Sequence, residues 1–143
     1  MVFFDTNIFI YIVSAAPADR AKREIAQRLM IESDFCLSVQ ILQEFMDVTL
    51  RKTQLGLTHA EISDMIRHMV GYPLVETSVA LAQRAFDIKT RFGIRYWDAA
   101  MVAAALELGC HTIYSEDLSH GQDYGGVRVV NPFKRKFPLS QRG

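Results

Sequence analysis

Short apolar runs alternate with longer segments of helical character along this 143-residue chain. The runs expected to form strands are residues 2–4, 35–38, 73–75, 112–115 and 127–130. The segments between them that are expected to form helices are residues 7–13, 19–31, 39–52, 58–71, 78–93 and 96–108. Alternation of this kind is typical of βαβ units. We therefore predict an α/β fold with a mostly parallel five-stranded sheet that helices cover on both faces.

Several of the predicted helices carry local start signals or a distinct pattern. Thr58 and Glu61 have capping-box spacing, which is typical of a helix N-terminus. Residues 8–13 have strand propensity, but Asp5-Thr6-Asn7 interrupts the strand with turn and cap residues, so a helix is preferred there. In the helix at 78–93 we expect Val79, Ala82 and Phe86 to face inward. The Ala-rich helix at 96–108 can approach a sheet closely.

Composition limits the class of protein. Half of the residues are apolar and the length suits one core, so residues 1–143 are expected to form one domain. Sixteen basic and 16 acidic residues cancel, which weakens the case for a nucleic-acid binder without excluding it. Cys36 and Cys110 have no metal-ligand spacing and are expected to be core thiols. With no signal peptide or membrane span visible, we expect a cytoplasmic protein.

Four carboxylates occupy comparable places in this pattern. Asp5 and Asp117 each follow a predicted strand, and Glu44 and Asp98 lie near the starts of predicted helices. Each has an ordinary explanation by itself. Asp5 and Asp98 can cap helices, Asp117 can form an Asx-turn, and Glu44 can reach water at the edge of an apolar stripe.

Taken together, the four carboxylates predict a common site. The carboxyl ends of parallel strands meet at one edge of the sheet, and the helices that leave this edge start there. Carboxylates brought so close repel one another unless some are protonated or a cation binds. All-oxygen ligands suit Mg²⁺ or Mn²⁺. The chemistry that this predicts is metal-assisted attack of water on a phosphodiester.

The sequence resembles the PIN-domain proteins, in particular the toxins of VapBC toxin–antitoxin pairs. The resemblance covers nearly the whole chain. It is carried by FFDTNIFIY at the start, SVQILQEF around Glu44, YWDAAMVAAALELGC around Asp98, and TIYSEDLSHGQ followed by VRVVNPF. It implies a three-layer α/β/α sandwich and a Mg²⁺- or Mn²⁺-dependent endoribonuclease whose products carry 5′-phosphate and 3′-hydroxyl ends.

The resemblance also assigns roles to residues. It places Asp5, Glu44, Asp98 and Asp117 at the family's catalytic, metal-binding acids. It places Thr6, Asn7 and Ser115 at its polar positions, which support the carboxylates or bind phosphate oxygens. Asp5, Asp98 and Glu44 would hold the first metal ion, and Asp117 would help to hold a second ion or orient the attacking water. Glu116 and Asp123 lie near Asp117 and are alternative acids for that position.

Partners follow from the same resemblance. It implies an RNA substrate, a cognate antitoxin whose arginine can block the acidic pocket, and a homodimer, for which the apolar helices within 39–70 offer a surface. Tyr96 and Trp97 are expected to pack beneath the site rather than stack on bases. Cations that could follow an RNA backbone are Arg51, Lys52, Arg91, Arg95, Lys134, Arg135 and Lys136.

Two other functional classes require residues that this sequence lacks. A HAD-type phosphatase requires a second Asp two residues after the first, and Asn7 occupies that position. A phosphoacceptor receiver domain requires a Lys after its late strand, and none follows residues 112–115 directly. A catalytically weak PIN-like module that binds RNA or a protein partner through its acidic pocket stays open. The sequence names neither the RNA nor the cleavage site.

Overall fold

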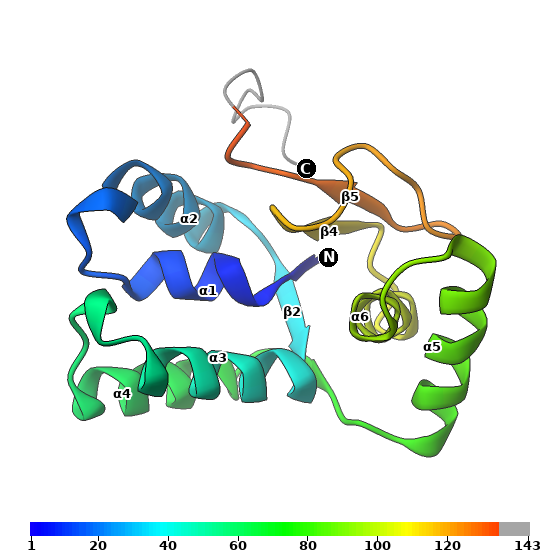
Figure 1. Ribbon diagram of the computed structural model, residues 1–143, viewed down its shortest axis with the longest axis horizontal. Helices are drawn as coiled ribbons and strands as arrows, with labels where there is room; N and C mark the ends of the chain where they lie inside the picture. The colour runs from blue at the N-terminus through cyan, green and yellow to red at the C-terminus, as the bar shows by residue number, and fades with distance from the viewer. Residues whose placement is uncertain (135–143) are drawn as a thin grey trace.

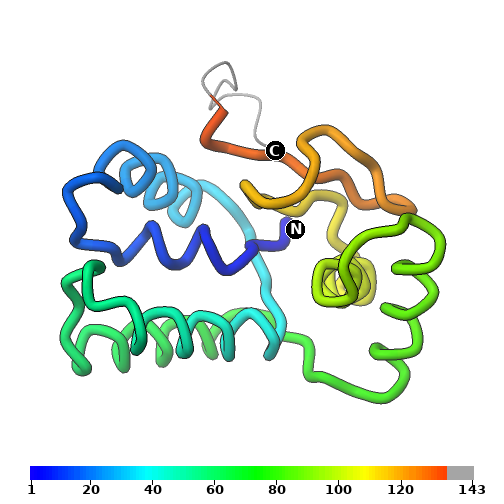
Figure 2. The backbone as a smooth tube through the Cα atoms, viewed as in Figure 1, coloured from blue at the N-terminus to red at the C-terminus, as the bar shows by residue number. Residues whose placement is uncertain are grey.

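Five parallel strands form a central sheet in the computed structural model, which describes residues 1–134. The sheet order is β3-β2-β1-β4-β5, and every pair of neighbours is parallel. The strands are β1 (Val2–Phe4), β2 (Phe35–Ser38), β3 (Leu74–Val75), β4 (Thr112–Tyr114) and β5 (Arg128–Val130). In register, Phe3 lies between Cys36 and Ile113, so the first strand of the chain is the middle strand of the sheet (Figure 2).

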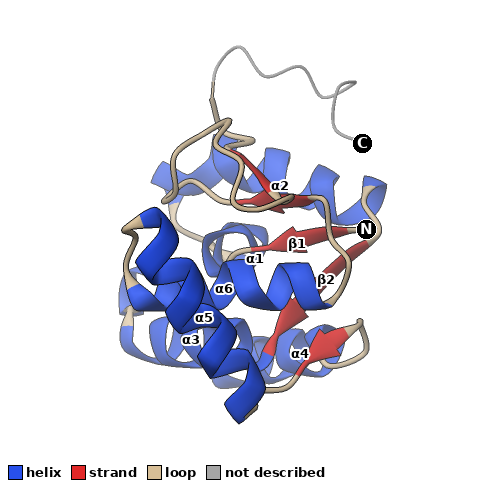
Figure 3. Cartoon of the chain, turned by 90° about the vertical axis from the view of Figure 1, so that its right-hand side faces the viewer, coloured by secondary structure: helices blue, strands red, loops and turns tan. Residues whose placement is uncertain are grey.

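Six α-helices cover the sheet in two layers. They are α1 (Thr6–Val13), α2 (Arg20–Glu32), α3 (Val39–Arg51), α4 (His59–Met69), α5 (Val79–Phe92) and α6 (Tyr96–Glu107). Helices α1 to α4 lie on one side, and α5 and α6 lie on the other (Figure 1). The predicted α/β/α sandwich with a five-stranded parallel sheet is confirmed. Seen from the side of α5, this helix crosses in front of α6, which covers the strands (Figure 3).

Packing explains why these elements adopt this arrangement. Phe3 and Phe4 are fully buried, and the Phe4 ring stacks on Phe35 with centroids 4.5 Å apart. On the opposite layer, all seven residues from Ala99 to Ala105 are buried. Small side chains let α6 sit close to the strands and to α5, in line with the expectation that an Ala-rich helix can approach a sheet or another helix closely. Cys36 and Cys110 are buried free thiols with Sγ atoms 2.9 Å apart, so the prediction that both lie in the core is confirmed.

The exposed face of α5 differs from the prediction. Val79 and Phe86, which were expected to face inward, are 76% and 64% exposed, whereas Leu81, Ala85 and Ile88 are buried. Both sets of apolar residues have helical spacing, so periodicity alone leaves two possible stripes. Because α5 packs mainly on α6, only one of these stripes can be covered. The prediction for Val79 and Phe86 was therefore wrong.

The ends of the helices follow the local signals closely. Ser38, Thr58 and Ser78 each cap a helix by accepting a hydrogen bond from the backbone N–H three residues later. Helix α1 begins one residue earlier than predicted because Asp5 caps it. Within residues 1–134, no helix is long and apolar enough to span a membrane.

The capping box at the start of α4 gives a direct test of local stability. Thr58 Oγ1 accepts from the Glu61 N–H at 3.1 Å, and Glu61 Oε1 accepts from the Thr58 N–H at 2.9 Å. Thr58→Ala should lower the free energy of unfolding by about 1 kcal/mol, because it leaves the Glu61 N–H without its side-chain acceptor. Urea denaturation followed by circular dichroism measures this change.

Thr90→Ala is the matched control for that measurement. Thr90 is also an exposed threonine, but its hydroxyl donates to the Phe86 carbonyl inside α5 and caps nothing. We expect this variant to stay within about 0.5 kcal/mol of the parent. Equal losses in the two variants would contradict a role for the cap.

Candidate active site

Asp5 lies where β1 ends and α1 begins, and it is only 6% exposed. Its backbone N–H donates to the Tyr114 carbonyl at 3.0 Å, which joins this point to the end of β4. One carboxylate oxygen accepts from the Thr6 N–H at 2.6 Å and caps α1. The other accepts from the Ser115 hydroxyl at 2.6 Å. Asp5 therefore serves as a cap and also stands at the sheet edge where ligands bind in α/β folds.

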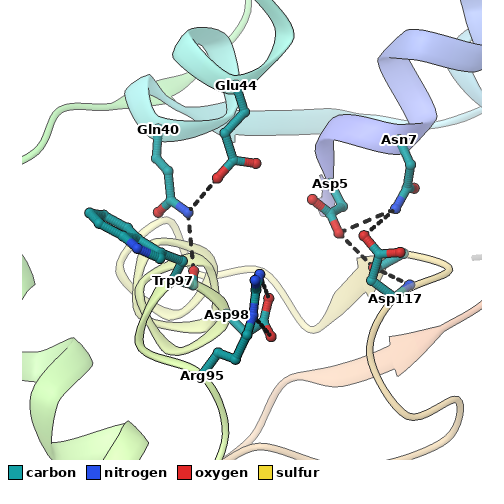
Figure 4. A network of polar contacts seen from close by, with 9 residues as sticks. Asp5, Asn7, Gln40, Glu44, Arg95, Trp97, Asp98 and Asp117 are labelled. Atoms are coloured by element: carbon teal, nitrogen blue, oxygen red, sulfur yellow. Dashed lines mark hydrogen bonds and ion pairs between the residues drawn. The ribbon is translucent and has the colours of Figure 1, made fainter. Parts of the chain in front are cut away.

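Asp117 reaches the same edge from the loop after β4. Its backbone N–H donates to Ser115 Oγ at 3.1 Å. The Asn7 side-chain amide donates to Asp117 Oδ2 at 3.1 Å and to Asp5 Oδ2 at 3.4 Å, so it links the two carboxylates (Figure 4). The side-chain carbonyl oxygen of Asn7, Oδ1, is buried and has no hydrogen-bond partner among the described residues.

Glu44 approaches from α3 on the other side of the site. One of its oxygens accepts from the Thr6 hydroxyl at 2.8 Å. The other accepts from the Gln40 amide at 3.0 Å, and the same amide donates to the Trp97 carbonyl at 3.1 Å. Gln40 thereby ties α3 to α6. Gln40 was not among the site residues predicted from the sequence, although its position four residues before Glu44 places both on one face of a helix.

Asp98 lies in the first turn of α6 and is held by Arg95. The guanidinium donates to both carboxylate oxygens, at 3.2 and 3.3 Å. The Arg95 side chain is 75% exposed, so this pair adds little to stability. Hydrogen bonds to Asp98 raise the pKa of Arg95, and the charges of Glu44 and Asp117 also contribute. The guanidinium therefore lies within the field of three of the four acids.

The electrostatics of Asp5 reflect its crowded, buried position. Burial raises the pKa of the Asp5 carboxyl to about 7, hydrogen bonds from Ser115 and Thr6 oppose this rise, and the charges of Asp117 and Glu44 add to it. Near neutral pH the carboxyl is thus divided between its two forms. A cation bound beside it would favour the charged form.

The donor set fits a divalent cation bound partly through water. The side chains that converge supply carboxylate and amide oxygens, which suit Mg²⁺ or Mn²⁺. Within residues 1–134, no three acidic, histidine or cysteine side chains are gathered tightly enough to hold one ion together. Mg²⁺ commonly keeps several waters and takes only one or two carboxylates directly. The unpartnered Asn7 oxygen offers a further acceptor for such a water.

Glu116 and Asp123, which left the assignment of Asp117 open, are engaged elsewhere. Glu116 forms an ion pair with Lys22 at 2.8 Å and accepts a short hydrogen bond from the Tyr11 hydroxyl. Asp123 accepts from the Gly126 N–H at 2.8 Å, which closes a turn. Of the three acids, only Asp117 is linked to Asp5.

Trp97 lies on the flank of the site rather than beneath it. Its side chain is 59% exposed, and Figure 4 shows the indole beside Gln40, pointing away from the Asp98 carboxylate. The expectation that it packs under the site was wrong, because the alanines of α6 already fill the side that faces the sheet. Tyr96 is half-buried, with its ring 5.0 Å from that of Trp97.

The predicted backbone-tracking cations are dispersed. Arg95 is in the site, Arg51 pairs with Asp47 at 3.6 Å, and Arg91 stacks over the Phe92 ring. Lys52 lines a cavity of about 600 Å³ that runs along α1 to Asp117. Lys134 is the last described residue, and Arg135 and Lys136 lie outside the described residues.

Comparison with known proteins identifies the fold family. The family model for the PIN domain matches residues 2–121. No curated protein sequence matches the chain significantly.

The chain is similar to solved structures over most of their length, and three examples follow. A VapC toxin of Mycobacterium tuberculosis, described as cleaving the sarcin–ricin loop, has 18% identity and a TM-score of 0.64 over 82% of this chain and 90% of its own. A toxin–antitoxin complex from Klebsiella pneumoniae has 17% identity and a TM-score of 0.68 over 93% and 98%. The FitAcB structure from Neisseria gonorrhoeae has 17% identity and a TM-score of 0.61 over 94% and 99%. At these identities the likeness shows the fold.

Proposed function

This chain belongs to the PIN-domain family, and from that premise we propose that it is a divalent-metal-dependent endoribonuclease, the toxin of a type II toxin–antitoxin pair. The convergence of Asp5, Glu44, Asp98 and Asp117 at one edge of the sheet carries the proposal. The similar structures support it, because one is described as a toxin that cleaves the sarcin–ricin loop and another as a toxin–antitoxin complex.

In this proposal each acid keeps the role that the resemblance to PIN-domain proteins implies. Asp5, Asp98 and Glu44 would hold Mg²⁺ or Mn²⁺ directly or through water, and Asp117 would hold a second ion or orient the attacking water. The ion, when bound, would lower the pKa of that water and offset charge on the phosphate.

Three polar residues would keep the carboxylates in place. Ser115 and Thr6 donate their hydroxyl hydrogens to Asp5 and Glu44, so these carboxylates keep their orientation. The Asn7 side-chain amide donates to both Asp5 and Asp117 and so bridges the two carboxylates. The expected products carry 5′-phosphate and 3′-hydroxyl ends.

The proposed partners follow from the surfaces around the site. The cavity of about 600 Å³ beside Asp117 is lined by Asp19 and Glu116 as well, with Lys52 as its cation. An acidic cavity of this kind suits a basic side chain from an antitoxin. A homodimer is also proposed, and the exposed apolar residues Val79 and Phe86 on α5 add to the candidate surface.

Cleavage of RNA by the purified protein, free of any partner, tests the nuclease. We expect cleavage with Mg²⁺ or Mn²⁺, none in EDTA, and recovery when the metal is restored in excess. Asp5→Asn should remove cleavage, whereas Asp47→Asn, which alters an exposed carboxylate of α3, should leave it unchanged. Calorimetry of Mn²⁺ binding accompanies the assay.

The alternative is a module that binds RNA or a protein partner without turnover. RNA binding without cleavage under any metal condition would favour this alternative. Cleavage that persists in EDTA would contradict the role of a metal ion.

A further inference from the structure

A second, smaller cavity lies beside the acidic cluster, between the start of α3 and helices α5 and α6. Its volume is about 180 Å³. Leu81, Ala82 and Ala100 form part of an apolar wall, and Gln43 and Thr77 bring an amide and a hydroxyl to it. The described residues that line this cavity carry no charge.

This cavity is joined to the acidic cluster by direct contacts. Gln40 lines the cavity, and its side-chain amide donates both to Glu44 and to the Trp97 carbonyl. Trp97 also lines the cavity and is the residue immediately before Asp98. Figure 4 shows Gln40 between the Trp97 indole and Glu44. A molecule in the cavity therefore lies next to the proposed metal-binding carboxylates.

Trp97 has a position that core packing does not explain. It is the single tryptophan of the chain, it is 59% exposed, and it borders an apolar hollow. Unpaired bases in RNA are recognised by stacking on aromatic side chains and by hydrogen bonds to their polar edges. An exposed indole next to an uncharged, mostly apolar cavity with amide and hydroxyl groups offers both kinds of contact.

We propose that this cavity binds an unpaired nucleobase of the RNA, next to the scissile phosphate, with the base stacked on the Trp97 indole. The proposal rests on the proposed function, in which RNA is the substrate. It adds that the RNA segment bound next to the site is single-stranded. The larger cavity along α1 is less suited to this ligand, because charged side chains line it, namely Asp19, Lys52, Glu116 and Asp117. A nucleobase is uncharged, and the smaller cavity is lined by uncharged residues among those described.

The single tryptophan makes the proposal directly testable by fluorescence. Asp5→Asn protein, which should not cleave, is titrated with a single-stranded RNA octamer and with a duplex of the same sequence. Stacking on the indole should quench the fluorescence with the single strand, and the duplex should quench it far less. Absence of quenching by the single strand, with binding detected by anisotropy of labelled RNA, would overturn the proposal.

Matched variants measure the contribution of the indole to affinity. In the Asp5→Asn background, Trp97→Ala should weaken octamer binding about 10-fold, the size expected for the loss of one base–aromatic stack. Trp97→Phe should recover most of the affinity. Ile31→Ala removes another exposed large apolar side chain, on α2 and outside the cavity lining, and should leave octamer affinity unchanged. Equal weakening by Trp97→Ala and Ile31→Ala would contradict a specific base site.

Two further outcomes separate this inference from the nuclease itself. Quenching by RNA in a wild-type protein that cleaves nothing would support the base site and reject the nuclease. A fluorescence change that depends on protein concentration alone, with no response to RNA, would show that a second copy of the chain covers Trp97, and would overturn the base site. The Trp97→Ala variant should bind Mn²⁺ with the same affinity as the parent, because the indole ring is not a metal ligand.

Discussion

Asp98→Asn is expected to lower metal-dependent RNA cleavage about 1,000-fold while leaving the fold intact. A bound metal supplies several kcal/mol of transition-state stabilisation, and each loss of about 1.4 kcal/mol costs a factor of ten in rate. The Asp98 side chain is 21% exposed and, within residues 1–134, forms its ion pair with the exposed Arg95, so the amide should be tolerated structurally. Single-turnover cleavage with Mg²⁺, together with calorimetry of Mn²⁺ binding, measures both effects.

Asp64→Asn is the matched control for Asp98. Asp64 also pairs with an arginine of its own helix at a spacing of three residues, Arg67, and is exposed on α4. This variant should cleave RNA like the parent. Retained cleavage in Asp98→Asn, or an equal loss in both variants, would remove Asp98 from the proposed site.

The stability of the metal-free protein is expected to fall as the pH rises from about 4 to about 7. The pKa of Asp5 rises from its ordinary value of 3.8 to about 7 in the folded chain, mainly because the carboxyl is buried. Between these values the folded state binds more protons than the unfolded state, so a higher pH favours unfolding. The ionisation of Asp5 lowers the free energy of unfolding by at most about 4 kcal/mol over this pH range.

Urea denaturation in EDTA at pH 5 and pH 8 measures this effect. Asp5→Asn cannot ionise, so its stability should change much less between the two pH values than that of the parent. Mn²⁺ at pH 8 should restore stability to the parent, because the charged carboxylate then has a cation beside it. The same pH dependence in the parent and in Asp5→Asn would show that another group causes it. Asp64→Asn should keep the pH dependence of the parent.

Local patterns in the sequence were enough to predict the order of the elements. The strands are short runs of apolar residues, and capping residues such as Thr58 and Ser78 start helices through contacts with backbone N–H groups a few residues away. The parallel topology then follows from the alternation of strands and helices. For the same reason, the sequence placed Asp5 and Asp117 at one edge of the sheet, since Asp5 directly follows β1 and Asp117 lies in the loop that follows β4.

Contacts between distant residues were decided only by the tertiary structure. Glu116 is not part of the acidic cluster, because it forms an ion pair with Lys22, which is 94 positions away in the sequence. The pKa of Asp5 depends on the burial of its carboxyl group, and no local sequence pattern specifies that burial. Trp97 and Phe86 were both placed inward from the sequence, but they are exposed because alanines and other residues of their helices fill the buried side. Helical periodicity specifies a spacing, whereas the neighbouring layers decide which face is covered.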